Sequence, residues 1–242
     1  MNDLDCWESK FESCCYSERL LTKLLLLNET AEQEIDILEV KKAIYYAKKY
    51  HGDQKRQSGE PYYSHPIEVA YLIVEYAVHY VTTDILVISI LHDVIEDTAL
   101  TKEVISYIFG DSIANKVEDL TRVKSDRKIS VAEIVILLWL QRKVDLLLIK
   151  IFDRLHNMQT INAKPPEKIN RITQETLKTF TSVGMFLQNI MPEILAVEET
   201  LMSLCLQNLP INELPVAQEP LAIFEDNFQL PSLIFQNEGS LC

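Results

Sequence analysis

Apolar residues recur at the spacing of an α-helix along most of this chain, and glycine is rare. Only 5 of the 242 residues are glycine, which disfavours a sheet protein built on many tight turns. We find neither a strand-rich region nor an internal repeat, so the sequence predicts an all-α, multi-helix bundle. Helices are expected over residues 35–50, 66–76, 85–97, 101–109, 112–123, 129–140 and 143–161, followed by helical sequence over 167–204.

Three details of these helices follow from the sequence. The helix over 35–50 is expected to place apolar residues on one face, namely Ile35, Leu38, Ala43, Ile44 and Ala47. An N-terminal cap for the helix from Ile85 is offered by Thr82, Thr83 and Asp84, and Gly110 is expected to end the helix over 101–109. In the last helical segment the expected weak points are Gly184 and Pro192.

Composition divides the chain into three regions. Residues 1–34 are an acidic N-terminal flank with a leucine-rich helix, residues 35–204 are the main helical domain, and residues 205–242 are an acidic tail. The tail contains four of the nine prolines and little periodicity, so we expect it to be irregular. The leucine stripe of the flank is expected either to pack on the domain or to mediate self-association. It consists of Leu20, Leu21, Leu24, Leu25 and Leu27.

The net charge of −13 disfavours a general nucleic-acid binder. The charge is uneven, however, because residues 1–40 carry a net charge of −7 and residues 205–242 a net charge of −5. The remaining segment, 41–204, has 21 acidic and 20 basic residues. A small anionic ligand in this nearly neutral segment is therefore compatible with the composition.

The five cysteines show no CxxC spacing, and their odd number does not indicate a disulfide framework. The acidic start MNDLDCWESK lacks the apolar region of a secretory signal. The longest apolar runs, such as Val131–Leu140, are too short to cross a bilayer. We expect a cytoplasmic protein that binds neither membranes nor nucleic acids.

A histidine–aspartate pair, His92 and Asp93, lies in an apolar stretch that we expect to be one helix, Ile85–Asp97. Buried polar side chains are costly unless something binds them. Glu96 and Asp97 follow His92 and Asp93 at a spacing of four, so on one helix all four side chains share an edge. Three carboxylates this close repel one another, and a bound cation would relieve the repulsion. The alternative is a helix end in which Glu96 and Asp97 are simply hydrated.

A second candidate, Asp153, lies in the apolar segment LLLIKIFDRLHNM. An aspartate among apolar neighbours again needs a partner. It could be a metal ligand, or it could form an ion pair with Lys150, three residues earlier. His156, taken alone, is more typical of a hydrogen-bonded core histidine than of a ligand.

A third candidate, His65, follows the loop KRQSGEPYY at the start of a helix. Pro66 favours the first turn of that helix. Lys55, Arg56 and Ser58 in the loop form either an anion-facing surface or an ordinary surface turn.

The three candidates combine imidazole and carboxylate groups, a set that suits Mn²⁺ or another first-row divalent ion. In chain order the set is His65, His92, Asp93 and Asp153. This order resembles that of the HD-domain metal phosphohydrolases.

Three motifs extend the resemblance to the hydrolase domain of the RelA/SpoT family, which degrades the alarmones ppGpp and pppGpp of the stringent response. They are R-x-S-G-E-P-Y-x-x-H-P at Arg56–Pro66, H-D-x-x-E-D-T at His92–Thr98 and D-R-L-H-N-M at Asp153–Met158. The segment KVEDLTRVK, Lys116–Lys124, is also similar to the family's V-x-x-L/V-T-K. The resemblance covers about residues 40–180, and the shared order of the motifs argues against a chance match.

The resemblance implies an HD-domain bundle and a guanosine-3′,5′-bis(diphosphate) 3′-diphosphatase, which binds guanosine tetra- or pentaphosphate and releases pyrophosphate. It implies that the Mn²⁺ ligands are His65, His92, Asp93 and Asp153. Glu96 and Asp97 would be the catalytic pair that orients and deprotonates the attacking water. The guanosine would be held by Arg56, Ser58, Asn157 and Thr160, with Arg56 stacked on the base.

The chain departs from the family's pattern at two places. Phe152 replaces the alanine that precedes the metal aspartate, where a larger ring could crowd the core or shift the ligand helix. After Phe180 the sequence TSVGMFLQNI does not match the family. The sequence would therefore suit a single-domain hydrolase or a truncated form of a longer one. Two alternatives are an HD phosphohydrolase for another nucleotide and a non-catalytic alarmone-binding or regulatory protein.

Overall fold

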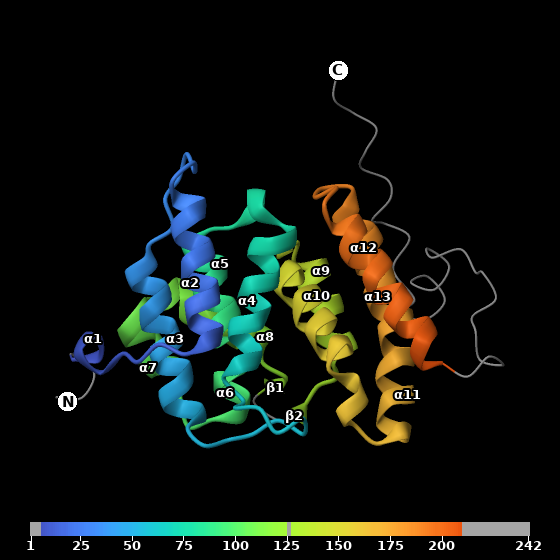
Figure 1. Ribbon diagram of the computed structural model, residues 1–242. Helices are drawn as coiled ribbons and strands as arrows, with labels where there is room; N and C mark the ends of the chain where they lie inside the picture. Colours follow the sequence, from blue (N-terminus) through green and yellow to red (C-terminus); the bar gives the residue numbers. More distant parts are fainter. Residues whose placement is uncertain (1–5, 125–126, 210–242) are drawn as a thin grey trace.

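The computed structural model describes residues 6–124 and 127–209, and it is built almost entirely of helices (Figure 1). Within these residues the only strands are β1 (Val123–Lys124) and β2 (Arg127–Lys128), which pair antiparallel. The all-α prediction is therefore confirmed. The expected tail falls mostly on residues 210–242, which lie outside the described residues.

The first half of the chain supplies the helices on one side of the bundle. They are α1 (Trp7–Lys10), α2 (Cys15–Asn28), α3 (Ile37–His51), α4 (Ser64–Tyr76), η1 (Val78–Tyr80), α5 (Thr83–Leu91), α6 (Val94–Asp97), α7 (Lys102–Phe109) and α8 (Asp111–Leu120). The second half supplies the other side, with α9 (Val131–Leu140), α10 (Val144–Gln159), η2 (Ile161–Ala163), α11 (Pro166–Glu175), η3 (Thr176–Phe180), α12 (Thr181–Gln188) and α13 (Ile194–Asn208).

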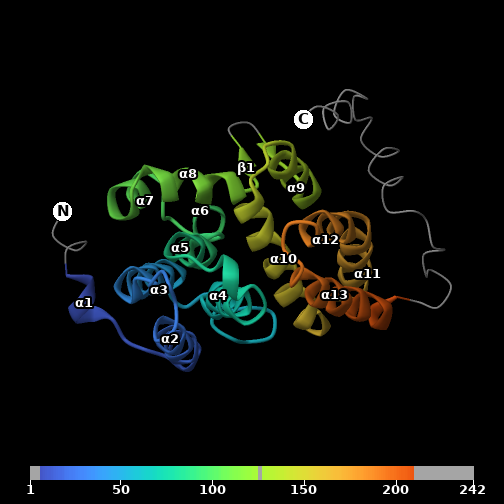
Figure 2. The same ribbon diagram turned by 90° about the horizontal axis from the view of Figure 1, so that it is seen from above.

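The leucine stripe of the N-terminal flank packs on the domain. Leu20 and Leu24 of α2 are fully buried, and α2 lies against α4 (Figure 2). Leu25, however, is 56% exposed, so its expected place on the packing face was wrong. On an α-helix Leu25 points about 100° away from Leu24, and it therefore faces solvent when Leu20 and Leu24 face α4. Self-association through the stripe stays a prediction.

Helix α3 begins where Asp36 caps it, because the Asp36 carboxylate accepts hydrogen bonds from the backbone N–H groups of Leu38 and Glu39. Ile44 and Ala47 are fully buried, as the periodicity predicts. Leu38 was also expected on this face, but it is 51% exposed because it lies in the first turn, at the edge of the packed surface.

The expected helix Ile85–Asp97 is interrupted, which corrects the sequence prediction. Thr82 caps α5 as expected, by accepting a hydrogen bond from the N–H of Ile85. The helix then ends at Leu91, and a separate short helix, α6, follows Asp93. His92 and Asp93 thus occupy a junction between two helices. Apolar periodicity does not reveal such a junction, because the backbone angles of both residues stay in the right-handed helical region.

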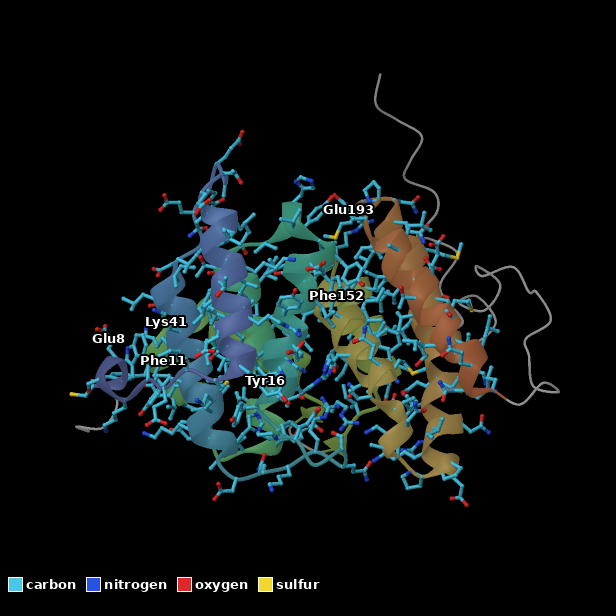
Figure 3. The ribbon with its side chains drawn as sticks, in the orientation of Figure 1. Glu8, Phe11, Tyr16, Lys41, Phe152 and Glu193 are labelled. Carbon is cyan, nitrogen blue, oxygen red and sulfur yellow. The ribbon has the colours of Figure 1, made fainter. Side chains whose placement is uncertain are left out.

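Helix α10 is the central helix of the bundle and packs against α4, α9, α12 and α13 (Figure 2). Phe152, which is labelled in Figure 3, lies on α10 and is fully buried. Its ring centroid lies 6.4 Å from that of Tyr76 on α4. The bundle therefore accommodates the larger side chain by burying it between two helices. Asp153, the next residue, still reaches the side chains of α4, as described below.

The segment after α10 is helical, as predicted. The short helix η2 follows α10, Pro165 then caps α11, and Pro166 is the first residue of α11. The chain turns again around Pro192 between α12 and α13. Gly184 was expected to be a weak point, but it lies inside α12. Helix α13 extends to Asn208, four residues beyond the predicted end of the helical domain at 204. The unmatched segment TSVGMFLQNI thus forms α12 and the start of the following turn. Both α12 and the next helix, α13, pack on α10.

No helix in the described part of the chain is both long and apolar enough to cross a membrane.

Candidate metal centre

Two of the predicted ligands lie on the two packed helices α4 and α10. His65 is in the first turn of α4, where Pro66 fits because the first backbone N–H groups of a helix have no intrahelical partner. Asp153 is in the middle of α10. The His65 Nε2 atom lies 3.1 Å from Asp153 Oδ1, and both side chains are largely buried. Two residues far apart in the sequence are therefore neighbours.

The other two predicted ligands come from the junction between α5 and α6. His92 is 1% exposed, and its Nδ1 donates a hydrogen bond to the carbonyl oxygen of Ser89 at 2.7 Å. Its Nε2 atom is buried without a hydrogen-bond partner, although Asp93 Oδ1 lies 3.1 Å away and Asp153 Oδ1 3.8 Å away. A buried nitrogen that faces two carboxylates without a hydrogen bond is in the environment of a metal ligand.

All four predicted ligands converge at one place. One ligand atom each of His65, His92 and Asp153 lies within 4.8 Å of the others. Asp93 Oδ2 is 3.6 Å from His65 Nε2, which adds a second carboxylate to the group. Two imidazole nitrogens and two carboxylates suit a first-row divalent ion. The residues present therefore fit a divalent metal, and the donor set by itself does not select Mn²⁺.

The charges of the cluster also favour a cation. Burial would raise the pKa of Asp93, but the adjacent His92 lowers it below its usual value. Burial likewise opposes ionisation of Asp153, whose pKa is nevertheless held well below its usual value, chiefly by Lys150. Burial alone would lower the pKa of His92, but Asp93 and Asp153 raise it to about 10. The two carboxylates thus attract positive charge to this place, and a divalent cation would satisfy the same attraction.

Two neighbours on α10 fix the Asp153 carboxylate. The Asn157 Nδ2 group donates to Asp153 Oδ1 at 2.6 Å. Lys150 Nζ lies 3.5 Å from Asp153 Oδ2, so the ion pair considered from the sequence is present. The two interpretations of Asp153 are compatible, because one oxygen faces the two histidines and the other faces the lysine.

The predicted acid/base residues lie on α6, and only Asp97 stays beside Asp93, because the Tyr62 hydroxyl reaches Asp93 Oδ2 at 3.5 Å as well as Asp97. Glu96 points to Arg122, with Arg122 Nη2 at 2.6 Å from Glu96 Oε1. Asp97 accepts a hydrogen bond of 2.6 Å from the Tyr62 hydroxyl. Burial raises the pKa of Asp97 although this hydrogen bond lowers it, and Asp93 raises it further. The two carboxylates thus have different partners and different environments.

Three of the four predicted guanosine-binding residues are in contact. Arg56 Nη2 donates to Asn157 Oδ1 at 3.0 Å and to Thr160 Oγ1 at 3.3 Å. Ser58 is exposed, and its hydroxyl donates to Glu60 at 3.4 Å. Arg56, Asn157 and Thr160 therefore form one polar cluster at the end of α10, with Ser58 on the loop beside it.

Three residues of the site were not predicted from the sequence as site residues. Arg122 holds Glu96, Tyr62 holds Asp97, and His156 contacts both Arg56 and His65. All three lie inside the segments that resemble the RelA/SpoT family, and this position is the sequence feature that could have identified them. Burial and the neighbouring His65 lower the pKa of His156 to about 3, so this imidazole is neutral.

A groove of about 760 Å³ lies between α12 and α13, away from the metal ligands. Met185, Leu195 and Met202 line it. It contains none of the site residues described above, and we assign it no part in the chemistry.

The fold and the arrangement of the candidate ligands are those expected of an HD domain, and comparison with known proteins agrees on the domain. The sequence model of the HD domain matches residues 43–185, more than half of the chain. The chain belongs to the HD domain family.

Its relatives include proteins named as a GTP pyrophosphokinase rsh and as a (p)ppGpp synthase/hydrolase SpoT, which confirms the resemblance to the RelA/SpoT family. "GTP pyrophosphokinase rsh" of Brucella ovis is 38% identical over 161 residues, which are 63% of this chain and 21% of that protein. "Bifunctional (p)ppGpp synthase/hydrolase SpoT" of Escherichia coli is 35% identical over 171 residues, which are 68% of this chain and 24% of that protein. The matched region thus spans about a quarter or less of these curated relatives.

A solved structure shares the fold, and it was reported as "A metazoan ortholog of SpoT hydrolyzes ppGpp and plays a role in starvation responses". The TM-score is 0.56 at 24% identity, with 70% of this chain and 94% of that chain covered.

Proposed function

We propose that this protein is a Mn²⁺-dependent hydrolase of the alarmones ppGpp and pppGpp, a guanosine-3′,5′-bis(diphosphate) 3′-diphosphatase. The observation that carries the proposal is the convergence of His65, His92, Asp93 and Asp153 beside Glu96 and Asp97. The names of the relatives support the substrate, because they include a (p)ppGpp synthase/hydrolase. The cytoplasm is the proposed location, in line with the unpaired thiols Cys6, Cys14, Cys15 and Cys205.

In this proposal the His65, His92, Asp93 and Asp153 side chains would hold the ion, which lowers the pKa of a bound water and polarises the 3′-phosphoryl group. Glu96 and Asp97 would orient the water and take its proton. The water oxygen forms a bond to the phosphorus attached to the 3′ oxygen, and the bond between that phosphorus and the 3′ oxygen breaks. The 3′ oxygen takes up a proton, and the products are pyrophosphate and GDP or GTP.

The polar cluster at the end of α10 would hold the nucleoside. Asn157 and Thr160 already bind the Arg56 guanidinium, whose planar face is suited to stack on a base. Asn157 also binds Asp153, so one amide touches both the metal centre and the cluster. A guanosine bound here would have its 3′ substituent near the ligands.

The test is a pyrophosphate-release assay on the purified protein with ppGpp and Mn²⁺. We expect turnover by the unmodified protein and its loss in Asp93→Ala and in Glu96→Gln, while His79→Gln, an exposed change outside the site, serves as the matched control. Absence of turnover with Mn²⁺, Mg²⁺, Co²⁺ and Zn²⁺ would contradict the proposal.

Two alternatives are separated by related measurements. Hydrolysis of another nucleotide would show in a panel of nucleotides assayed side by side, and the R-x-S-G-E-P-Y loop argues for guanosine. A non-catalytic alarmone-binding protein would bind ppGpp without hydrolysis. The departure at Phe152 motivates this second alternative, but Asp153 keeps its 3.1 Å contact with His65 beside the buried ring, which favours catalysis.

A further inference from the structure

A buried histidine outside the predicted ligand set connects the nucleoside cluster to the metal centre. His156 lies on α10 and is 8% exposed. Its Nδ1 atom is 3.1 Å from Arg56 Nη1 and 2.8 Å from His65 Nδ1. One nitrogen atom therefore contacts both an arginine of the loop and a predicted metal ligand.

The positions of the protons on these three side chains follow from donor chemistry. A guanidinium can only donate, so the His156 Nδ1 atom that faces Arg56 must be an acceptor. The proton of the neutral His156 ring is then on Nε2. Because His156 Nδ1 is an acceptor, the His65 Nδ1 atom at 2.8 Å must be the donor.

This assignment leaves the other nitrogen of His65 with a lone pair. His65 Nε2 faces Asp153 Oδ1 at 3.1 Å and Asp93 Oδ2 at 3.6 Å. The 3.1 Å contact is a hydrogen bond only if Nε2 carries the proton. With the proton on Nδ1, Nε2 presents a lone pair to both carboxylate oxygens, and these groups repel one another unless a cation lies between them. The hydrogen bond from His65 to His156 therefore prepares His65 for a metal ion.

His92 shows the same arrangement with a different acceptor. Its Nδ1 donates to the Ser89 carbonyl, and its Nε2 faces the carboxylates. A backbone carbonyl is the ordinary acceptor behind a metal-binding histidine. For His65 the acceptor is the His156 side chain, which also accepts a hydrogen bond from Arg56.

We propose that His156 is a positioning residue that fixes the tautomer and orientation of His65 for metal binding, and that Arg56 orients His156. Arg56 thereby serves the metal centre as well as the nucleoside cluster. The inference rests on the metal site of the proposed function, and it does not depend on the identity of the nucleotide.

The test measures Mn²⁺ affinity in the absence of nucleotide, by titration calorimetry and by the electron paramagnetic resonance signal of free Mn²⁺. His156→Leu removes the acceptor with a similar volume, and His156→Asn retains an acceptor oxygen close to the position of Nδ1. We expect the leucine variant to bind Mn²⁺ roughly 10–100-fold more weakly, the usual effect of losing the partner behind a ligand. The asparagine variant should remain within several-fold of the unmodified protein, as should the exposed control His79→Gln.

A second readout tests the proton positions directly. Long-range ¹H–¹⁵N spectra of the histidine rings, assigned with the single variants, should show His65 protonated at Nδ1 and His156 protonated at Nε2. Circular dichroism and thermal unfolding establish that each variant is folded.

The outcomes separate this inference from the proposed activity. Unchanged Mn²⁺ affinity in folded His156→Leu, equal weakening in the leucine and asparagine variants, or a His65 proton on Nε2 would each overturn the role of His156. Weaker Mn²⁺ binding in His156→Leu together with no hydrolysis of ppGpp by the unmodified protein would support the role of His156 and overturn the proposed substrate.

Discussion

The Arg122 guanidinium binds both carboxylate oxygens of Glu96, with Nη2 at 2.6 Å from Oε1 and Nε at 3.2 Å from Oε2. The backbone N–H of Arg122 also donates to Oε2, at 3.3 Å. The Glu96 side chain is 9% exposed, whereas that of Arg122 is 36% exposed. A carboxylate held at three points has a fixed orientation, which a residue that positions water requires.

We therefore expect Arg122→Gln to lower kcat for ppGpp by roughly 10- to 100-fold, because a displacement of about 1 Å at a catalytic group can cost on the order of 100-fold. Mn²⁺ affinity should change little, since the hydrogen bonds and the ion pair of Arg122 go to Glu96 and not to a predicted ligand. Steady-state kinetics and Mn²⁺ titration measure the two effects. Arg122→Lys keeps the charge and should recover part of kcat. Equal kcat in Arg122→Gln and the unmodified protein would contradict this role.

Metal should stabilise the fold, because only the folded chain brings the side chains of His65, His92, Asp93 and Asp153 together to bind it. At a metal concentration 100 times Kd the stabilisation is about 2.7 kcal/mol, which raises Tm by roughly 5–10 °C in a chain of this size. Differential scanning calorimetry with Mn²⁺ and after chelation measures the shift. His79→Gln should show the same shift, and Asp153→Asn a much smaller one. A Tm that is insensitive to Mn²⁺, Co²⁺ and Zn²⁺ would argue against the site.

Phe152 should be a stabilising core residue. Its ring is fully buried and packs near Tyr76, so restoring the family's alanine leaves a cavity. We expect Phe152→Ala to lower the free energy of unfolding by about 3–5 kcal/mol, as measured by urea denaturation. Leu137→Ala, which truncates a side chain that is 43% exposed, is the matched control and should cost less than about 1 kcal/mol. A more stable Phe152→Ala variant would indicate that the ring crowds the core.

Glu198 on α13 should reduce stability at neutral pH. Burial raises its pKa, despite a hydrogen bond from Gln188, and the neighbouring Glu199 raises it further. A carboxyl group whose pKa is higher in the folded than in the unfolded chain favours folding only while it is protonated, so its contribution is lost as the pH rises through the folded-state pKa.

We expect Glu198→Gln to increase the free energy of unfolding at pH 7. The effect should diminish as the pH falls through the raised folded-state pKa and should be largely gone by about pH 4.5, the ordinary pKa of a glutamate. Urea denaturation over this pH range measures the difference between the variant and the unmodified protein. Glu199→Gln is a control on the same helix, at a neighbouring position that is less buried. A stabilising effect of Glu198→Gln that is larger at acidic pH than at pH 7 would contradict this prediction.

The sequence predicted a helix well where apolar periodicity coincides with a residue that caps or ends the helix. Helix α5 begins at its predicted Thr82 cap, and α7 ends before Gly110, whose φ of 88° favours glycine. The interruption after Leu91 was missed because His92 and Asp93 keep helical backbone angles, so only their tertiary contacts distinguish them. The exposure of Leu38 and Leu25 was missed for a related reason, since periodicity does not show where the packed face ends.

His92, Asp93 and Asp153 could be found because each is a polar residue in an apolar segment, and such a residue needs a partner wherever it lies in the chain. His65 follows a polar loop instead, and it was found through the order of the motifs. The partners themselves were not predictable from local pattern. Arg56 and His156 are 100 residues apart, and Arg122 and Glu96 are 26 apart. Contacts of this kind depend on how helices pack, which spacing within one helix does not reveal.

Two helices outside the HD-matched segment, α2 and α13, lie against the helices that carry His65 and Asp153 (Figure 2). Helix α2 packs on α4 and is tied to it by the ion pairs Arg19–Glu68 and Lys23–Glu75. Helix α13 packs on α10 and buries Val197 and Leu201. The two helices thus pack on opposite sides of the helix pair that carries His65 and Asp153. A shortened protein limited to residues 43–185 would keep every proposed ligand and lose both of these packing helices. The smallest active fragment should therefore be longer than the segment that matches the HD domain.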